Sequence, residues 1–109
     1  MLIDGNRAVV PSLWHLEMAN SIAVAERRKI ISASDVDRAL RDVDQLIGLA
    51  IETDSNFVSV REACSQARLL NLSAYDATYL GLAKREGIPM ATLDSQLRTA
   101  ARQSGVQIV

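Results

Sequence analysis

The sequence predicts an α/β fold in which helices cover both faces of a short parallel sheet. Short β-branched or apolar runs alternate with longer segments of helical periodicity along the 109 residues. Strands that alternate with helices are usually parallel, because each helix returns the chain to the same edge of the sheet. Apolar residues make up 49% and charged residues 23% of the chain, and this length suits one hydrophobic core. We therefore expect a single domain over residues 1–109.

The first half of the chain is expected to contain a strand, two helices and a second short strand. Residues 8–10, closed by Pro11, favour a strand, and Ser12 is a candidate N-cap for a helix over about residues 13–28. Ser34 and Asp37 have the spacing of a capping box, which predicts a second helix over about residues 35–46. Residues 49–51 favour a second strand, with continuation of the helix as the open alternative.

The second half is expected to contain three helices and two strands. A helical stripe over residues 57–70 precedes Asn71, a residue type that tolerates the left-handed conformation at helix ends. Ser73 and Asp76 repeat the capping pattern before a helix over residues 74–86, which Gly87 ends. A strand over residues 88–93, a helix over about residues 95–103 and a last strand over residues 106–109 complete the pattern.

Charge and cysteine content narrow the classes of protein. The chain has 12 basic and 13 acidic residues, so no overall positive field attracts nucleic acid and a polyanion site needs local clusters. The candidate clusters are residues 27–29, residues 84–85 and Arg98 with Arg102, each expected to be a solvated helix end or face. The single cysteine, Cys64, excludes an internal disulfide and is expected to be a buried thiol.

No stretch of the sequence is typical of a membrane protein. No apolar run approaches the roughly 20 residues that span a bilayer, and the first residues lack a basic region followed by a long apolar one. With the lone cysteine, these features favour the reducing cytoplasm and predict no membrane partner.

Three acidic residues are the candidate functional side chains. Asp94 directly follows a predicted strand, where ligands bind in open α/β sheets. Glu17 lies about one turn into a predicted helix and Asp76 in the first turn of another, on faces that they share with apolar side chains. Because a buried carboxylate needs a partner, three such groups in one cleft suit Mg²⁺. Spacing alone leaves the alternative open that Asp76 and Asp94 are helix caps and Glu17 is a solvated helix residue. His15 is expected to have a structural or surface role.

Two segments resemble a known family. "VPSLWHLEMANSI" and "LSAYDATYLGLAKREGIPMATLDSQLRTAARQSGV" are similar to the PIN-domain ribonucleases, in particular the VapC-like toxins of toxin-antitoxin pairs. In that family the matched acids hold Mg²⁺ or Mn²⁺ in a three-layer α/β/α domain that cuts RNA. The resemblance implies that Glu17, Asp76 and Asp94 are the catalytic, metal-binding acids and that Asn20 supports or orients a ligand. It also implies an RNA substrate and a cognate antitoxin as partners.

The sequence departs from this family at its start. Family members begin with a central strand whose Asp supplies a further essential acid, before the segment that starts here near Arg7. Asp4 is not assigned to that place, because residues 4–6 are expected to form a turn. Without the central strand, the strands over residues 8–10 and 90–93 must pair directly, recruit another chain or stay exposed, and a homodimer is the expected result. Three explanations stay open: a start placed too late, a natural remnant, or a rearranged domain completed by dimerisation.

Two functions of different classes follow from these features. The first is a Mg²⁺-dependent endoribonuclease, the toxin of a toxin-antitoxin pair, which cleaves RNA phosphodiester bonds at a carboxylate metal site. The alternative is a catalytically impaired PIN remnant that acts as a dimerisation or antitoxin-binding module.

Overall fold

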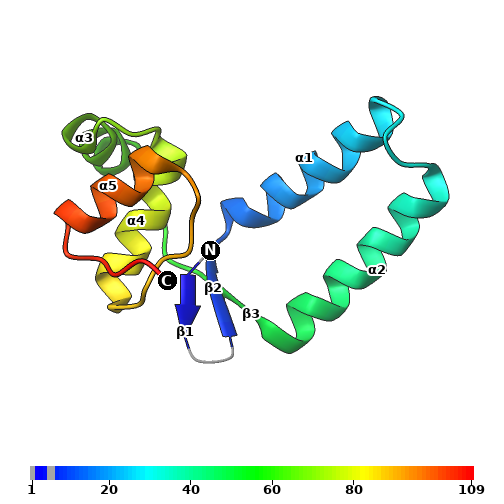
Figure 1. Cartoon of the computed structure of the whole chain (residues 1–109), viewed down its shortest axis with the longest axis horizontal. Helices are drawn as coiled ribbons and strands as arrows, with labels where there is room; N and C mark the ends of the chain where they lie inside the picture. The colour runs from blue at the N-terminus through cyan, green and yellow to red at the C-terminus, as the bar shows by residue number, and fades with distance from the viewer. Residues whose placement is uncertain (1, 5–6) are drawn as a thin grey trace.

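The computed structural model describes residues 2–4 and 7–109, and within them the chain forms five helices and three strands (Figure 1). The expected α/β class is therefore confirmed. The elements are β1 (Leu2–Asp4), β2 (Arg7–Pro11), α1 (Leu13–Arg27), α2 (Ala33–Ala50), β3 (Ile51–Asp54), α3 (Val60–Leu70), α4 (Ala74–Glu86) and α5 (Ser95–Gln103).

The sheet is mixed, with the order β1-β2-β3. β2 and β3 are parallel, as expected, with Ala8 opposite Ile51, whereas β1 is antiparallel to β2, with Leu2 opposite Val9. Isolated bridges extend the sheet beyond β1, because Leu2 also pairs antiparallel with Met90, and Met90 pairs parallel with Ile108. The expectation of a wholly parallel sheet is wrong for β1, which reaches β2 through a hairpin and not through a helix.

β1 lies between β2 and the bridge residue Met90. The sequence was expected to leave these two segments paired directly, joined to another chain or exposed, and that expectation is wrong. The first residues of the same chain satisfy the backbone groups between them, and Leu2 is fully buried there. Of the turn expected over residues 4–6, residues 5 and 6 lie outside the described part of the chain.

β2 separates two apolar cores, because alternate residues of a strand point to opposite faces. Val9 faces one core, whereas Ala8 and Val10 face the other. We call the first the α4–α5 core; its buried residues are Leu2, Val9, Leu80, Leu82, Ala83, Met90, Leu97, Ala100, Ala101 and Val106. We call the second the arm core; its buried residues are Ala8, Val10, Trp14 and Ile51, with Met18, Val43 and Ile47 packed against them.

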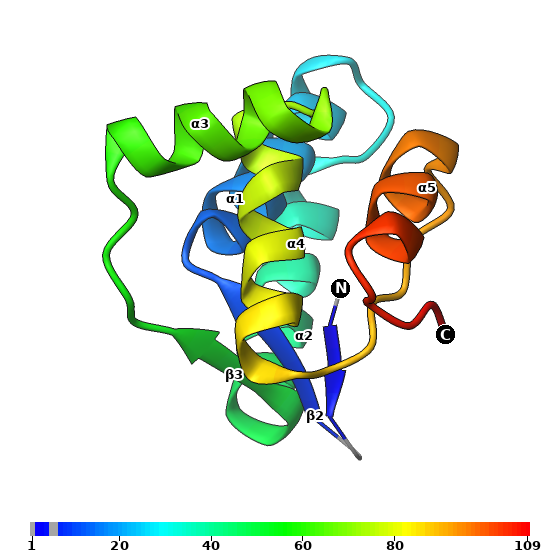
Figure 2. The ribbon, with the colours of Figure 1, turned by 90° about the vertical axis from the view of Figure 1, so that its left-hand side faces the viewer.

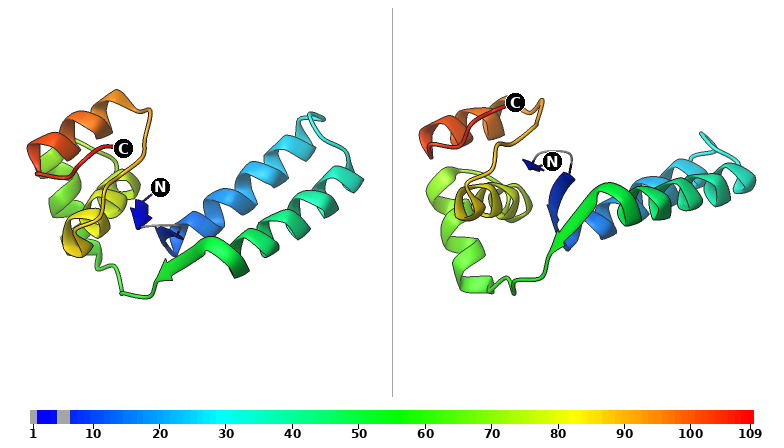
Figure 3. Two further views of the ribbon diagram at one scale, coloured as in Figure 1. Left: turned by 60° about the horizontal axis from the view of Figure 1, so that its bottom comes forward. Right: turned by 90° about the horizontal axis from the view of Figure 1, so that it is seen from below.

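The helices α1 and α2 form an arm that projects away from the other helices, side by side along its length (Figures 1 and 3). The principal extents are 43 × 29 × 26 Å and the radius of gyration is 15.2 Å, against about 13 Å for a compact chain of roughly 100 residues. Several large apolar side chains on the arm are exposed: Leu16, Ile30, Leu40, Leu46 and Leu49.

The arm helix α2 begins two residues earlier than expected. Its capping box joins Ser32 and Asp35: Ser32 Oγ accepts from the Asp35 amide at 3.2 Å, and Asp35 Oδ2 accepts from the Ser32 amide at 2.9 Å. The sequence holds two overlapping Ser-x-x-Asp matches, and the chain uses the first in place of Ser34 and Asp37. At its other end, α2 continues through Ala50, so the strand expected over residues 49–51 becomes β3, which begins at the last of them.

Most other helix ends agree with the sequence. α1 runs as expected, although Ser12 has helical dihedral angles and, among the described atoms, its side chain makes no capping hydrogen bond. α3 ends at Asn71 with a φ of 54°, and α4 ends at Gly87 with a φ of 65°, both in the left-handed region. α5 has the expected bounds.

The last two expected strands are each reduced to a single bridge residue. The Met90 amide donates to Gln107 O at 2.8 Å and Met90 O accepts from the Val109 amide at 3.0 Å. Pro89, just before the bridge, lacks an amide hydrogen, which shortens the possible ladder. The strands expected over residues 88–93 and 106–109 are therefore wrong in length but right in place.

Helix α3 lies across one end of α4 (Figure 2) and packs on it along one side. Its apolar stripe is exposed at the start, where Val60 is 88% exposed and Phe57 just before the helix is 93% exposed, whereas Ala63, Ala67 and Leu70 are half-buried. Cys64 is also exposed, so the expectation of a buried thiol is wrong. The predicted helix is present, but no second layer covers the outer side of α3 within the described residues.

The burial of β1 predicts a strong effect of truncating Leu2. We expect Leu2→Ala to lower the free energy of unfolding by about 2 to 5 kcal/mol, because it removes a fully buried side chain from the α4–α5 core. Urea unfolding followed by circular dichroism measures this. Leu93→Ala is the control: that side chain is 96% exposed, so a change within about 0.5 kcal/mol is expected. Equal stability of both variants would contradict the placement of β1.

The register of the α2 cap predicts unequal effects of two serine substitutions. Ser32→Ala should cost about 1 kcal/mol of stability and Ser34→Ala clearly less, because the Ser32 hydroxyl accepts from the amide of Asp35. Hydrogen bonds from the backbone and side chain of Ser32 lower the pKa of Asp35 below its ordinary 3.8. This contribution is present above pH 3.8 and disappears as the pH falls through the lower folded value. Urea unfolding across acidic pH tests both points, and a larger effect of Ser34→Ala would contradict the register.

Candidate metal-binding and catalytic site

Glu17 and Tyr79 connect α1 with α4. The Tyr79 hydroxyl donates to Glu17 Oε1 at 2.5 Å, across 62 positions of sequence. α1 starts immediately after β2 and so carries Glu17 about one turn beyond that strand, while α4 packs on the strand itself. Tyr79 contacts both the α4–α5 core and the arm core. The fold therefore joins Glu17 to α4 at the junction of the two cores.

Asp76 belongs to the same region. It precedes Tyr79 by three residues on α4, so the two side chains lie on one face of the helix. Its amide donates to Ser73 Oγ at 3.0 Å, which confirms that the serine caps α4. The capping position leaves the Asp76 carboxylate at the positive end of the helix dipole.

The pKa of Tyr79 shows how the two acids act on one phenol. Burial raises the pKa of Tyr79 well above its ordinary 10.0, and the hydrogen bond to Glu17 and the negative charges of Glu17 and Asp76 raise it further. Each of these effects disfavours the phenolate. The phenol therefore remains a proton donor, with Glu17 as its hydrogen-bond acceptor and Asp76 three residues before it on α4.

Asp94 is the N-cap of α5. Its Oδ1 accepts from the Leu97 amide at 2.8 Å, and its own amide donates to Thr92 Oγ1 at 3.2 Å. The capping role that the sequence left open for Asp94 is thus present. The side chain is exposed, and this capping bond uses one of its two oxygens.

A divalent cation needs several ligating side chains or waters gathered around one point. In the part of the chain that the structure describes, no three His, Cys, Asp or Glu side chains form a group that could hold a metal ion. Glu17, Asp76 and Asp94 therefore do not gather into a three-carboxylate site. Mg²⁺ commonly takes one or two protein carboxylates and completes its shell with water and substrate phosphate. A metal site on Glu17 and Asp76 is therefore kept as a proposal.

Asn20 and His15 lie on α1 with Glu17. Asn20 is exposed and follows Glu17 by three residues, on the same face of the helix. Its supporting role stays a prediction. His15 Nε2 lies 2.8 Å from Thr53 Oγ1 and ties α1 to β3, which agrees with the expected structural role.

Two of the basic candidates are engaged inside the chain. Arg85 forms an ion pair with Asp54 at 2.9 Å, where the Asp54 side chain is only 15% exposed. Arg98 donates to Thr92 O at 3.2 Å. Arg85 thus links α4 to the end of β3, so the expectation of a merely solvated helix end is wrong there.

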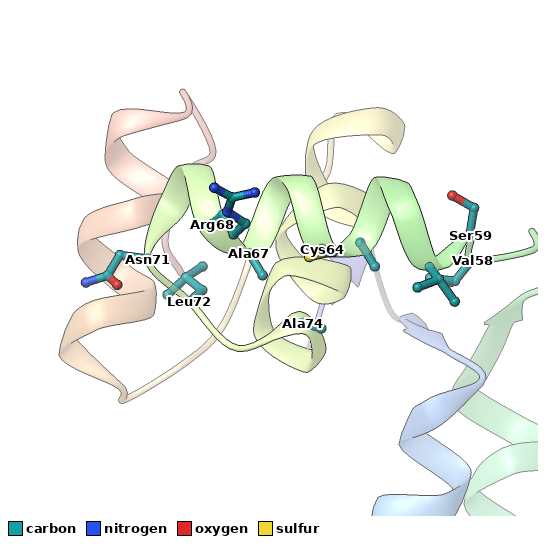
Figure 4. Close-up of a pocket in the computed structure, with 10 residues that line it drawn as sticks. Val58, Ser59, Cys64, Ala67, Arg68, Asn71, Leu72 and Ala74 are labelled. Atoms are coloured by element: carbon teal, nitrogen blue, oxygen red, sulfur yellow. The ribbon is translucent and has the colours of Figure 1, made fainter.

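A separate groove of about 610 Å³ runs between α3 and the start of α4 (Figure 4). Its lining is mainly apolar and includes Val58, Cys64 and Leu72, with Arg68 at its edge. The three predicted acids are not among its described lining residues. The groove offers apolar surface and not a place for phosphate chemistry.

Tyr79 is the site residue that sequence reasoning missed. The available signal was its position three residues after Asp76 on a predicted helix, which placed both on one face. Its contact with Glu17 depends on how α1 and α4 pack on β2, and helical spacing does not contain that information.

The environment of Tyr79 predicts an alkaline titration that depends on folding. In a Tyr75→Phe variant, Tyr79 is the single tyrosine left. We expect its tyrosinate absorbance to develop at higher pH in the folded protein than in urea, where a pKa near 10 is restored. Stability linked to the phenol should be fully present below about pH 10 and disappear as the pH rises through the folded value. Equal midpoints in both states would contradict the partial burial of Tyr79 and its hydrogen bond to Glu17.

Comparisons with known proteins leave the family of the chain open. No protein-family model matches the sequence, and no curated protein matches it. None of the helices in the described residues is long and apolar enough to span a membrane. The geometry of Glu17, Asp76 and Tyr79 is therefore the main structural support for a function.

Proposed function

We propose that this chain is a divalent-metal-dependent endoribonuclease of the PIN type, acting in the cytoplasm as the toxin of a toxin-antitoxin pair. The observation that carries the proposal is the hydrogen bond from the Tyr79 hydroxyl to Glu17, which joins Glu17 to the helix that carries Asp76 three residues before Tyr79. These two acids are distant in sequence, and both belong to the segments that resemble PIN nucleases. Helices on both faces of the sheet agree with a PIN-like three-layer arrangement.

The residues of the chain would divide the chemistry among them. Glu17 and Asp76 would supply oxygen ligands to Mg²⁺ or Mn²⁺, Asp94 would add an oxygen through water or substrate, and Asn20 would support Glu17. When bound, such an ion orients a water for in-line attack on a phosphodiester and stabilises the leaving oxygen. Basic side chains beside the site would hold the RNA backbone, so that binding weakens with salt.

The proposed site has one acid fewer than the family's set. β1 pairs in the antiparallel direction, so the backbone of Asp4 lies opposite Arg7, at the end of β2 away from α1. We therefore expect weaker metal binding than a complete set of carboxylates would give.

A second candidate is a non-catalytic interaction module that pairs with an antitoxin or with a second copy. The observation that favours it is the exposed apolar surface of the arm, where Leu16 is 74% and Leu49 is 78% exposed. Exposed apolar side chains gathered on a projecting element are typical of protein interfaces. A homodimer would cover this surface.

Metal titration separates the two candidates. We expect calorimetry to detect Mn²⁺ binding by the unaltered chain, and Glu17→Gln and Asp76→Asn to weaken it at least tenfold. Asp94→Asn should weaken it less, and since Asn also caps helices, α5 should remain folded. Asp42→Asn, an exposed acid on α2, is the control and should not change the affinity. Failure of the unaltered chain to bind Mn²⁺ would favour the interaction module.

Cleavage of a mixed pool of small RNAs is the matching activity test. Products should form with Mg²⁺, disappear with EDTA and decrease strongly in Asp76→Asn. Cleavage that continues in excess EDTA would contradict the metal mechanism.

A further inference from the structure

The arm formed by α1 and α2 buries little of its own surface. All residues of the two helices are described, and Trp14 is the one buried side chain of α1, whereas α2 has none. Helices in proteins take most of their stability from an apolar face packed against another element. The two helices lie side by side along the arm (Figures 1 and 3). This single seam leaves the outer sides of the arm in solvent.

Large apolar side chains are exposed along the whole length of the arm. Leu16 and Leu49 lie near its base, and Leu40 lies midway along α2. Ile30, in the turn between the helices, is 71% exposed at the tip. Contiguous exposed apolar surface on a soluble protein usually marks a place where another molecule binds. The surface to be covered is therefore the length of the arm and not one local patch.

The surface area of the chain is large enough for such an interface. Its accessible area is 7533 Å², whereas a compact monomer of 11.9 kDa is expected to expose about 6,000 Å². The surplus of about 1,500 Å² exceeds the roughly 800 Å² that each partner buries in a standard protein interface. A partner lying along the arm would bring the exposed area back toward that of a compact protein.

The two halves of the arm differ in charge. In the base, residues 13–25 and 42–50 contain no lysine or arginine and three acids, which are Glu17, Asp42 and Asp44. In the tip, residues 26–41 contain three acids and five basic residues, which are Arg27, Arg28, Lys29, Arg38 and Arg41. One of the tip acids, Asp35, is already engaged by Arg38 and by the amide of Ser32. The tip is therefore net positive and the base net negative.

We infer that the arm binds the arm of a second copy of this chain, with the two arms antiparallel. Arms related by a two-fold axis lie side by side either with their tips together or with each tip against the other base. Tips together would bring basic residues against basic residues. In the antiparallel arrangement each basic tip meets an acidic base, which is the favourable pairing. The two hairpins would form a four-helix bundle, and the exposed leucines would contribute to its core.

This interface is independent of the proposed nuclease activity, and it differs from the contact that the sequence predicted. Self-association was expected at an exposed edge of the sheet, but β1 covers that position. An antitoxin or another protein is the rival occupant of the arm. A second copy is favoured because one arm carries both halves of the charge pattern and is therefore complementary to itself.

Sedimentation equilibrium of the full chain over a concentration series tests the interface. We expect a dimer of the unaltered chain. Leu16→Glu combined with Leu40→Glu should weaken dimerisation about tenfold or more, because it places charges in the apolar contact. Leu69→Glu is the matched control, since Leu69 lies on α3 and is 76% exposed, and its dimer should persist. Circular dichroism verifies that each variant is folded.

Cross-linking tests the antiparallel direction. In a Cys64→Ser background, which removes the single cysteine of the chain, Ile30→Cys marks the tip and Leu16→Cys marks the base. When the two variants are mixed, a short bis-maleimide reagent should join tip to base. Mass spectrometry identifies the joined peptides, and Ile30→Cys alone should give few cross-linked dimers.

The outcomes separate this interface from the proposed function. A chain that stays monomeric at every concentration, or a dimer lost equally in Leu69→Glu, would overturn the arm interface and leave the metal and RNA tests unaffected. Cross-links of tip to tip would overturn the antiparallel arrangement. A dimer that is lost selectively in the arm variant and cross-links from tip to base supports the inference.

Discussion

The burial of β2 on both faces is the constraint on which the rest of the structure depends. Its residues alternate between two cores, with Val9 in one and Val10 in the other. A strand buried on both sides needs apolar elements above and below it. α4 covers one face, and the base of the α1–α2 arm covers the other. The direction of β2 thus sets the position from which both helices reach the candidate site.

The candidate site lies where these two coverings meet. α1 leaves the end of β2 after Pro11, and α4 crosses the opposite face, so Glu17 and Asp76 start on different sides of the sheet. Tyr79 is long enough to contact both cores and still donate to Glu17. Its burial and its acidic neighbours raise its pKa, which keeps it protonated. The packing that stabilises the fold therefore also fixes the polar contact.

Helices could be predicted from the sequence because their signals are local. Ser73, Asn71 and Gly87 mark ends that the structure reproduces, since caps and left-handed residues act within one turn. Strands were predicted less well, because pairing depends on distant partners. Nothing local to residues 2–4 indicated that they would pair with Val9 and Met90. The prediction that Cys64 on α3 is buried was wrong for a related reason. Periodicity identifies the apolar face of a helix, but it does not show whether another element covers that face.

The candidate acids were predictable as residues but not as a group. Asp94 could be foreseen both as a cap and as a ligand, and the structure places it at the start of α5 with one oxygen bound to the Leu97 amide. The contact between Glu17 and Tyr79 was not predictable, because it spans 62 positions and depends on the packing of α1 against α4. Spacing can thus select residue types for a metal site, whereas which of those residues lie near one another is a property of the tertiary fold.

The pairing of β1 and its direction have separate consequences. β1 satisfies the backbone of β2 and Met90, so the fold does not require a further strand at this position. Because β1 is antiparallel, its last residue, Asp4, pairs with Arg7, at the end of β2 opposite to the one that leads into α1. A parallel strand in the same place would instead end on the side of Glu17. The direction of this short strand therefore places the backbone of Asp4 at the end of β2 away from Glu17.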